Sequence, residues 1–219
     1  MSAAGSGRLV AWASLAGVLA TLSYAGRLAE GKPPEDILYR YTAAIAGLVQ
    51  YAVMLGLVLL ISVGLAKREL LGLRRPASWP RAAALAFAVL VGVGVLSALL
   101  EPLLHAGEEQ GLTPERWERD RAVPFAANFV VIAGVAPVVE ELMFRGLGFG
   151  LLRRFGTGAA IVLVGVAFAL AHGLIAAFPI LFAFGSGLAY LRSRTGSVYP
   201  GMILHGAFNA IALVAAVAL

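Results

Sequence analysis

The chain contains no cysteine and few charged residues. Without cysteine, its 219 residues cannot form a disulfide framework, a thiolate metal site or a cysteine nucleophile. Only 13% of the residues are charged, against about 25% in soluble globular domains, and 60% are hydrophobic. The mean hydropathy of +0.88 reflects this imbalance. The composition therefore excludes an ordinary soluble domain and predicts an integral membrane protein.

The long apolar runs also lack the alternation of polar and apolar residues that a membrane β-barrel requires. They are rich in Ala, Leu, Val and Gly, and several approach the roughly 20 residues with which a helix crosses a hydrocarbon core of about 30 Å. We therefore expect an all-α fold, a polytopic transmembrane helical bundle of about seven spans. The expected spans are 9–25, 41–66, 82–104, 124–152, two short or recessed helices within 157–191, and 198–219.

The most charged segment lies between the third and fourth expected spans. Thr113 followed by Pro114 is typical of a helix start, and Trp117 suits an anchor at the membrane interface. A short interfacial helix is therefore expected near 113–121. Because the chain shows no low-complexity linker and no internal repeat, we expect a single integral membrane domain over 1–219.

Lysine and arginine are unevenly distributed over the loops. With seven spans, 11 of these residues fall on the side of the N-terminus and 6 on the other side. The positive-inside rule then predicts a cytoplasmic N-terminus. The Ala, Gly and Arg bias is typical of a high-GC bacterium, so the expected location is a bacterial inner membrane. The net charge of +5 reflects loop orientation, and the expected partner is the lipid bilayer, with no nucleic acid.

Two adjacent carboxylates and an arginine interrupt the apolar stretch PVVEELMFRG, residues 137–146. A carboxylate near the bilayer centre costs at least about 2.5 kcal/mol on insertion scales, so an intramembrane glutamate indicates function. On a helix, Glu141 and Arg145 share a face, whereas Glu140 points about 100° away. This spacing predicts a structural ion pair between Glu141 and Arg145. It leaves Glu140 as a free carboxylate in a cavity, where it suits a general base.

Three further polar residues lie in the apolar runs. They are His172, His205 and Asn209, the last of which follows His205 by one helical turn. Measured from the expected cytoplasmic helix ends, Glu140, His172, His205 and Asn209 lie roughly 18, 21, 10 and 16 Å deep at 1.5 Å per residue. All four side chains can therefore meet near the middle of the membrane.

In this order, these residues resemble the three motifs of the CPBP family of intramembrane glutamic proteases. This family, also called Abi, includes the type II CAAX prenyl endopeptidases and bacteriocin-processing or immunity proteins. The resemblance covers 125–219 and makes 121–219 the expected catalytic core, with 1–120 as accessory transmembrane helices. The matching motifs are Glu140-Glu141-x-x-x-Arg145, Phe168-x-x-x-His172 and His205-x-x-x-Asn209.

The resemblance implies an intramembrane endopeptidase. By analogy, Glu140 with His172 activates a water for hydrolysis of a peptide bond near the C-terminus or the membrane-proximal part of a substrate. His205 and Asn209 are expected to form the oxyanion hole, because preorganised donors stabilise developing negative charge in a water-poor site.

The resemblance also implies supporting residues and a substrate class. Glu141 and Arg145 are expected to hold the helix of Glu140 in place, and Phe168, one turn before His172, is expected to pack. The implied partner is a membrane-associated or lipid-modified peptide or protein, and prenylation of that substrate is left open.

Other chemistries fit the same residues. Glu140, His172 and His205 could bind divalent zinc as a His₂Glu site, but the chain has no H-E-x-x-H motif and these ligands come from three helices. The resemblance implies no metal, so no cofactor is expected. A secondary transporter or proton relay could also use buried Glu, His and Arg, although no repeat with paired broken helices is seen. A catalytically silent family member could act as a membrane interaction or immunity protein, although no expected catalytic position is missing.

Overall fold

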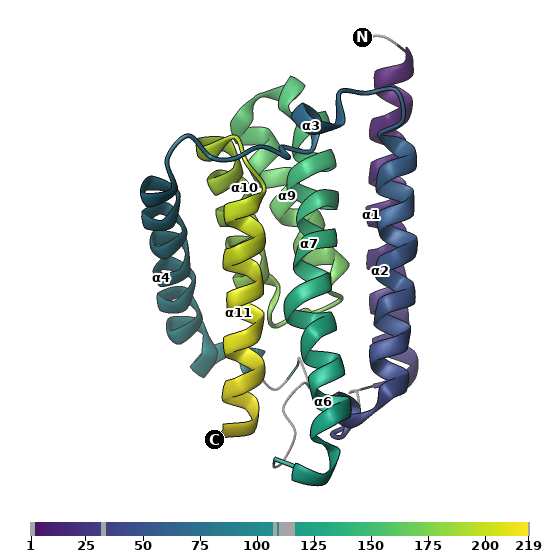
Figure 1. Ribbon diagram of the computed structural model, residues 1–219, viewed down its shortest axis with the longest axis vertical. Helices are drawn as coiled ribbons and strands as arrows, with labels where there is room; N and C mark the ends of the chain where they lie inside the picture. The colour runs from purple at the N-terminus through teal and green to yellow at the C-terminus, as the bar shows by residue number, and fades with distance from the viewer. Residues whose placement is uncertain (1–2, 32–33, 107–108, 110–116, 219) are drawn as a thin grey trace.

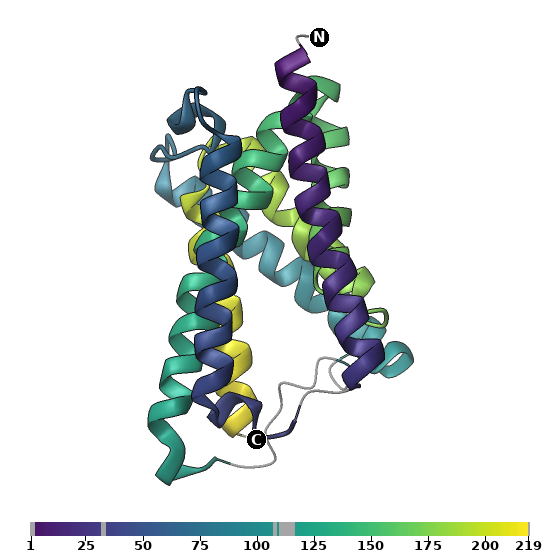
Figure 2. The ribbon, with the colours of Figure 1, turned by 90° about the vertical axis from the view of Figure 1, so that its right-hand side faces the viewer.

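The fold is a bundle of helices, most of which run roughly along the long axis of the molecule (Figure 1). The computed structural model describes residues 3–31, 34–106, 109 and 117–218, and these residues form no β-strand. The all-α membrane bundle predicted from composition is thereby confirmed. The two chain termini lie at opposite ends of the bundle (Figures 1 and 2), as an odd number of membrane crossings requires.

Seven long helical segments are present in the described part of the chain. The fourth is one continuous helix in which α-helical turns alternate with the π-helical turns η3 and η4. The segments are α1 (Ala3–Glu30), α2 (Tyr41–Ile61), α4 (Trp79–Leu104), α6–η3–α7–η4–α8 (Ala122–Phe129, Val130–Val135, Ala136–Glu141, Leu142–Gly148, Phe149–Leu152), α9 (Thr157–Ala171), α10 (Phe178–Thr195) and α11 (Tyr199–Ala218). Shorter elements are η1 (Ile37–Tyr39), α3 (Lys67–Leu70), η2 (Arg119–Arg121) and η5 (Arg153–Phe155).

Five of these segments are long and apolar enough to cross a membrane by themselves: 5–29, 41–61, 79–104, 119–155 and 199–218. Helix α9 has only 15 residues, which agrees with the short helices expected within 157–191. The segment α10 continues through two arginines to Thr195, where Gly196 ends it in the left-handed conformation.

Other helix boundaries differ from the prediction. The second span ends at Ile61 and not at residue 66. Helix α4 begins at Trp79, three residues earlier than expected, because Ser78 caps it and Pro80 occupies its first turn. Of the interfacial helix expected near 113–121, the start at Thr113 and Pro114 lies outside the described residues, and 119–121 forms the 3₁₀ turn η2.

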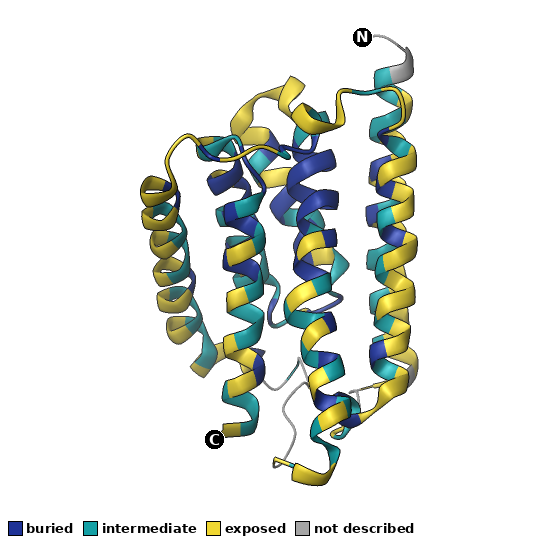
Figure 3. Ribbon diagram, in the orientation of Figure 1, coloured by how far each residue is buried: buried dark blue, intermediate teal, exposed yellow. Residues whose placement is uncertain are grey.

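The helices of the C-terminal half form the centre of the bundle. Helix α11 packs along η3 and α7, and α9 packs against α10 and α1. Buried residues concentrate from α7 into η4, while the outward faces of α1, α2 and α4 are exposed (Figure 3). Helices α1 and α2 diverge toward the end of the bundle that carries the C-terminus (Figure 2). The exposed side chains on α2 and α4 include Ile45, Leu60, Phe87 and Leu99, which suits contact with lipid.

The polar side chains of Asp36 and Asn128 fix where the α1–α2 loop meets α6. Asp36 forms ion pairs with Arg40 and Arg121, and the hydrogen bonds from these guanidinium groups, Arg40 first, lower the pKa of the Asp36 carboxyl. The amide of Asn128 donates to the carbonyl oxygens of Leu38 and Arg40, each at 3.0 Å. The start of α2 is thus tied to the helix that later carries Glu140.

Candidate active site

A cavity of about 430 Å³ lies between α2, α4, α7 and the three C-terminal helices. Helix α7 supplies one of the predicted site residues, α9 and its C-terminal cap supply two, and α11 supplies two. The predicted residues that line the cavity are Glu140, Phe168, His172, His205 and Asn209. The convergence expected from helix depth is therefore observed, and the chemical role of each residue remains a prediction.

Glu140 has two differently placed carboxylate oxygens. Its Oε1 accepts a hydrogen bond of 2.8 Å from the hydroxyl of Tyr51 on α2. Its Oε2 is buried and finds no hydrogen-bond partner in the described part of the protein, with Nε2 of His205 at 3.8 Å. One oxygen of the carboxylate is therefore held in place, and the other is buried with its capacity to accept a hydrogen bond unused.

Tyr51 is the site residue that sequence reasoning missed. It lies in the second span, which was expected to be an accessory helix, yet it lines the cavity together with Glu140. A tyrosine hydroxyl inside an apolar span needs a hydrogen-bond partner, because lipid offers none. This requirement is the feature of the sequence that could have pointed to a polar partner for Tyr51. The site thus draws on both halves of the chain.

The predicted ion pair between Glu141 and Arg145 is present and fully buried. Nη1 of Arg145 lies 2.8 Å from Oε1 of Glu141, and the two side chains are 0% and 1% exposed. Nη2 of Arg145 donates to the carbonyl oxygen of Gly185 at 3.0 Å, and the guanidinium carbon lies 4.2 Å from the ring centroid of Phe168. These extra contacts matter because a buried ion pair offsets its desolvation only when further hydrogen bonds satisfy it.

The carbonyl of Gly185 that accepts from Arg145 lies where α9 and α10 pack closely together. A Cβ atom on Gly185 would lie 3.2 Å from Cα of Gly165, so α9 and α10 approach through glycine faces. Phe168, between Arg145 and the histidines, fulfils the packing role expected of it: its ring centroid is 5.7 Å from that of His205 in an edge-on arrangement.

Glu141 also lies close to His205, which the spacing of Glu141 and Arg145 in the sequence did not predict. Nδ1 of His205 lies 3.4 Å from Oε1 of Glu141, close enough for charge interaction although without hydrogen-bond geometry. A Cβ atom on Gly201 would lie 2.5 Å from Oε2 of the same carboxylate, so any larger residue at 201 would have to displace the Glu141 side chain. His205 is consequently positioned between the carboxylates of Glu140 and Glu141.

His172 and Asn209 are oriented by backbone carbonyls. Nδ1 of His172 lies 2.7 Å from the carbonyl oxygen of Phe168. Because a carbonyl can only accept, this contact places a proton on Nδ1, and in the neutral imidazole the lone pair is then on Nε2. The amide of Asn209 donates to the carbonyl oxygen of Ile132 at 2.9 Å and has a second N–H to offer. Within the described residues, neither side chain hydrogen-bonds directly to Glu140, although all three residues line the same cavity.

The zinc alternative can be tested against this arrangement. Within the described ranges, no group of three or more His, Asp or Glu side chains is close enough together to hold a metal ion. Glu140, His172 and His205 therefore do not fit the three-ligand set of a His₂Glu site in this conformation. The expectation of a metal-free site stays a prediction.

Replacing Tyr51 with phenylalanine should slow catalysis more than it affects substrate binding. The Tyr51→Phe change removes the only hydrogen bond to Oε1 of Glu140 seen among the described residues and lets that carboxylate rotate. A lost hydrogen bond to a charged group is worth about 1.5–3 kcal/mol, so we expect kcat to fall by about ten-fold or more at unchanged KM. Tyr190→Phe, at an exposed tyrosine outside the cavity, is the matched control. An equal effect of both changes would contradict the role of Tyr51.

Comparison with known proteins adds one finding. Residues 122–211 match a family model described as type II CAAX prenyl endopeptidase Rce1-like. No curated protein and no solved structure matches the chain. The matched segment begins with α6 and includes all three motifs, whereas α1, α2 and α4 lie before it.

Proposed function

We propose that this protein is an intramembrane endopeptidase of the glutamic type, because residues 122–211 match the Rce1-like type II CAAX prenyl endopeptidase model, in agreement with the motif resemblance. The observation that carries the proposal is the carboxylate of Glu140. It is anchored through one oxygen by Tyr51, its other oxygen has no hydrogen-bond partner among the described residues, and the residue lines the same cavity as His172, His205 and Asn209.

In the proposed first step, Glu140 takes a proton from a bound water. Its Oε1 is occupied by Tyr51, so Oε2 is the oxygen that accepts. Nε2 of His172 carries a lone pair and accepts the second hydrogen of the same water, which orients its oxygen toward the substrate. The oxygen attacks the peptide carbonyl, and the proton held by Glu140 then passes to the leaving amine as the C–N bond breaks.

The negative charge that develops on the carbonyl oxygen needs donors. The second N–H of Asn209 is available, and Nε2 of His205, 3.8 Å from Glu140, donates when it carries a proton. Both groups are fixed before the substrate arrives, Asn209 by Ile132 and His205 by its place between two carboxylates. Donors fixed in this way need no reorganisation in the transition state.

The walls of the cavity indicate the class of substrate. Helix α10 supplies Ile180, Leu181 and Phe184, and α11 supplies Phe208, all of which line the space beside the polar group. An apolar wall of this kind suits a peptide that enters from the bilayer or carries a lipid. We propose a membrane-associated or lipid-modified peptide as substrate and a bacterial inner membrane, with the N-terminus cytoplasmic, as the location.

The proposal is tested by following peptide termini. Purified protein in liposomes is incubated with membrane-embedded peptides, with and without a farnesylated C-terminal Cys-a-a-X sequence, and cleavage is read by mass spectrometry. In parallel, membrane and secreted peptides of cells with and without the protein are compared. We expect one new terminus that depends on the protein. Solute or proton flux without any cleavage would instead establish the transporter alternative.

Chelation should leave cleavage intact. Since the proposed mechanism uses Glu140 and His172 without a metal, dialysis against excess chelator should change kcat by less than about two-fold, within the usual spread of such effects. Added zinc should give no activation. A loss of activity on chelation that zinc restores would refute the metal-free mechanism while leaving the peptidase function intact.

A further inference from the structure

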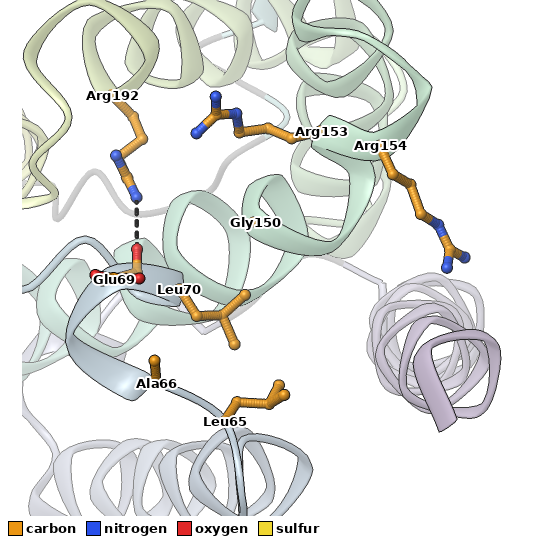
Figure 4. Close-up of a pocket in the computed structure, with 8 residues that line it drawn as sticks. All are labelled: Leu65, Ala66, Glu69, Leu70, Gly150, Arg153, Arg154 and Arg192. Atoms are coloured by element: carbon orange, nitrogen blue, oxygen red, sulfur yellow. Dashed lines mark hydrogen bonds between the residues drawn. The ribbon is translucent and has the colours of Figure 1, made fainter. Parts of the chain in front are cut away.

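A second cleft lies at the end of the bundle that carries the N-terminus, and the proposed peptidase chemistry does not use it. It has a volume of about 470 Å³ and shares no lining residue with the candidate active site. Its walls come from the loop at α3, from the turn η5 that follows Glu140's helix, and from the end of α10 (Figure 4). The polar lining residues are Glu69, Arg153, Arg154 and Arg192.

Arg192 is a buried cation, and its guanidinium has a hydrogen-bond donor without a partner among the described residues. Only 5% of the residue is exposed, and its Nε is buried without a hydrogen-bond partner among the described residues. Its Nη2 donates weakly, at 3.4 Å, to the carbonyl oxygen of Glu69 (Figure 4). A buried guanidinium with an unsatisfied donor is costly, which points to a partner that is missing from the chain itself.

The guanidinium of Arg192 is also fixed in place. Its carbon lies 5.8 Å from the ring centroid of Phe149. On another side it packs against Gly72, which has a φ of 67° and leaves no room for a Cβ atom beside the guanidinium. A side chain held in this way keeps its donors aimed in one direction and loses little entropy when a ligand binds.

The charged residues around Arg192 are mostly arginines. Arg153 turns toward it across the cleft, whereas Arg154 points away toward α1 (Figure 4). Within the described residues, no carboxylate lies within ion-pair distance of these three arginines, even though the side chain of Glu69 lines the cleft. Three arginines and one glutamate leave the lining with a formal charge of +2. The lining of the cleft is therefore positively charged, which favours an anion.

We propose that this cleft binds a phosphate group through Arg192 and Arg153. Guanidinium groups match phosphate oxygens in geometry, and because Arg192 and Arg153 both line the cleft, one phosphate can accept hydrogen bonds from both. The loop charges predict this end of the bundle to be cytoplasmic, where anionic lipid headgroups are concentrated. The phosphate can thus come from a lipid headgroup or from solution, and the experiment below separates the two sources.

The test is an equilibrium titration of the full-length protein in a neutral, phosphate-free detergent. Calorimetry measures the stoichiometry and the affinity of binding. The three titrants are dihexanoylphosphatidylglycerol, inorganic phosphate and uncharged dihexanoylglycerol. We expect one molecule of phosphatidylglycerol to bind per protein, inorganic phosphate to bind about ten-fold more weakly because it lacks the apolar chains, and dihexanoylglycerol not to bind saturably. Equal affinities for lipid and inorganic phosphate would identify soluble phosphate as the ligand and still support the phosphate site.

Matched variants decide whether the cleft is responsible. Arg192→Gln and Arg153→Gln should each weaken phosphatidylglycerol binding about ten-fold, the effect of losing one charge-assisted contact. Arg194→Gln removes the same charge from an exposed position on the same helix, outside the cleft, and should have no effect. Because Arg153 is exposed, its replacement remains informative even if Arg192→Gln does not fold. The proposal is overturned if neither phosphate compound binds, if binding survives both cleft variants, if Arg194→Gln weakens it equally, or if acetate competes as well as inorganic phosphate.

Discussion

Glu140→Gln is expected to abolish peptide cleavage while the protein stays folded. Glutamine preserves the shape of the side chain, and its carbonyl oxygen can still accept the hydrogen bond from Tyr51, but it cannot take a proton from water. General base catalysis contributes about 10²–10⁴-fold, so cleavage should fall by that factor. Cleavage is measured by mass spectrometry of a membrane peptide, and folding by the thermal unfolding midpoint in detergent.

Two companion variants make this result specific to the position of the carboxylate. Glu140→Asp keeps the charge but withdraws it by one methylene group from Tyr51 and His205, and misplacement by about 1 Å costs on the order of 10²-fold. Glu35→Gln changes an exposed carboxylate outside the cavity and should leave the rate unchanged. A Glu140→Gln protein that still cleaves at the wild-type rate would rule out Glu140 as the base.

Arg145→Leu is expected to destabilise the protein more than any other single change discussed above. It leaves the carboxylate of Glu141, which is 1% exposed, without its cation, and it frees the carbonyl of Gly185. Removing one partner of a buried ion pair costs about 3–5 kcal/mol, a large part of the stability of a typical domain. The yield of folded protein and the denaturant midpoint in detergent should both drop sharply.

The matched variants separate the lost pairing from lost packing. Arg145→Lys keeps the charge but loses the planar fork that reaches both Glu141 and Gly185, so it should be destabilised to an intermediate degree. The double change Glu141→Leu with Arg145→Leu removes both charges and should recover part of the loss. Arg194→Leu, at an exposed position, should have little effect. If Arg145→Leu were no more harmful than Arg194→Leu, the ion pair would have no structural importance.

Sequence reasoning predicted those features that depend on one helix. The spacing of Glu141 and Arg145 defines a shared face, and their ion pair is observed. The arrangement of spans followed from the length of the apolar runs, and the shortness of α9 followed from the residues available within 157–191. These predictions succeeded because hydrophobic length and helical periodicity are local properties of the sequence.

The features that were missed depend on contacts between helices. Nothing in the span that contains Tyr51 indicates that its hydroxyl meets Glu140, 89 residues further along the chain. The proximity of His205 to Glu141 likewise depends on the absence of a side chain at Gly201, which only packing reveals.

The hydrogen bond between Tyr51 and Glu140 also bears on the biogenesis of the protein. The chain is synthesised from its N-terminus, so α2 enters the membrane before the helix that carries Glu140. A glutamate that arrives in lipid alone is costly, whereas one that finds a hydroxyl already at the right depth is partly solvated on arrival. Helix α2, which lies before the matched family segment, would then receive the helix that carries Glu140 during insertion.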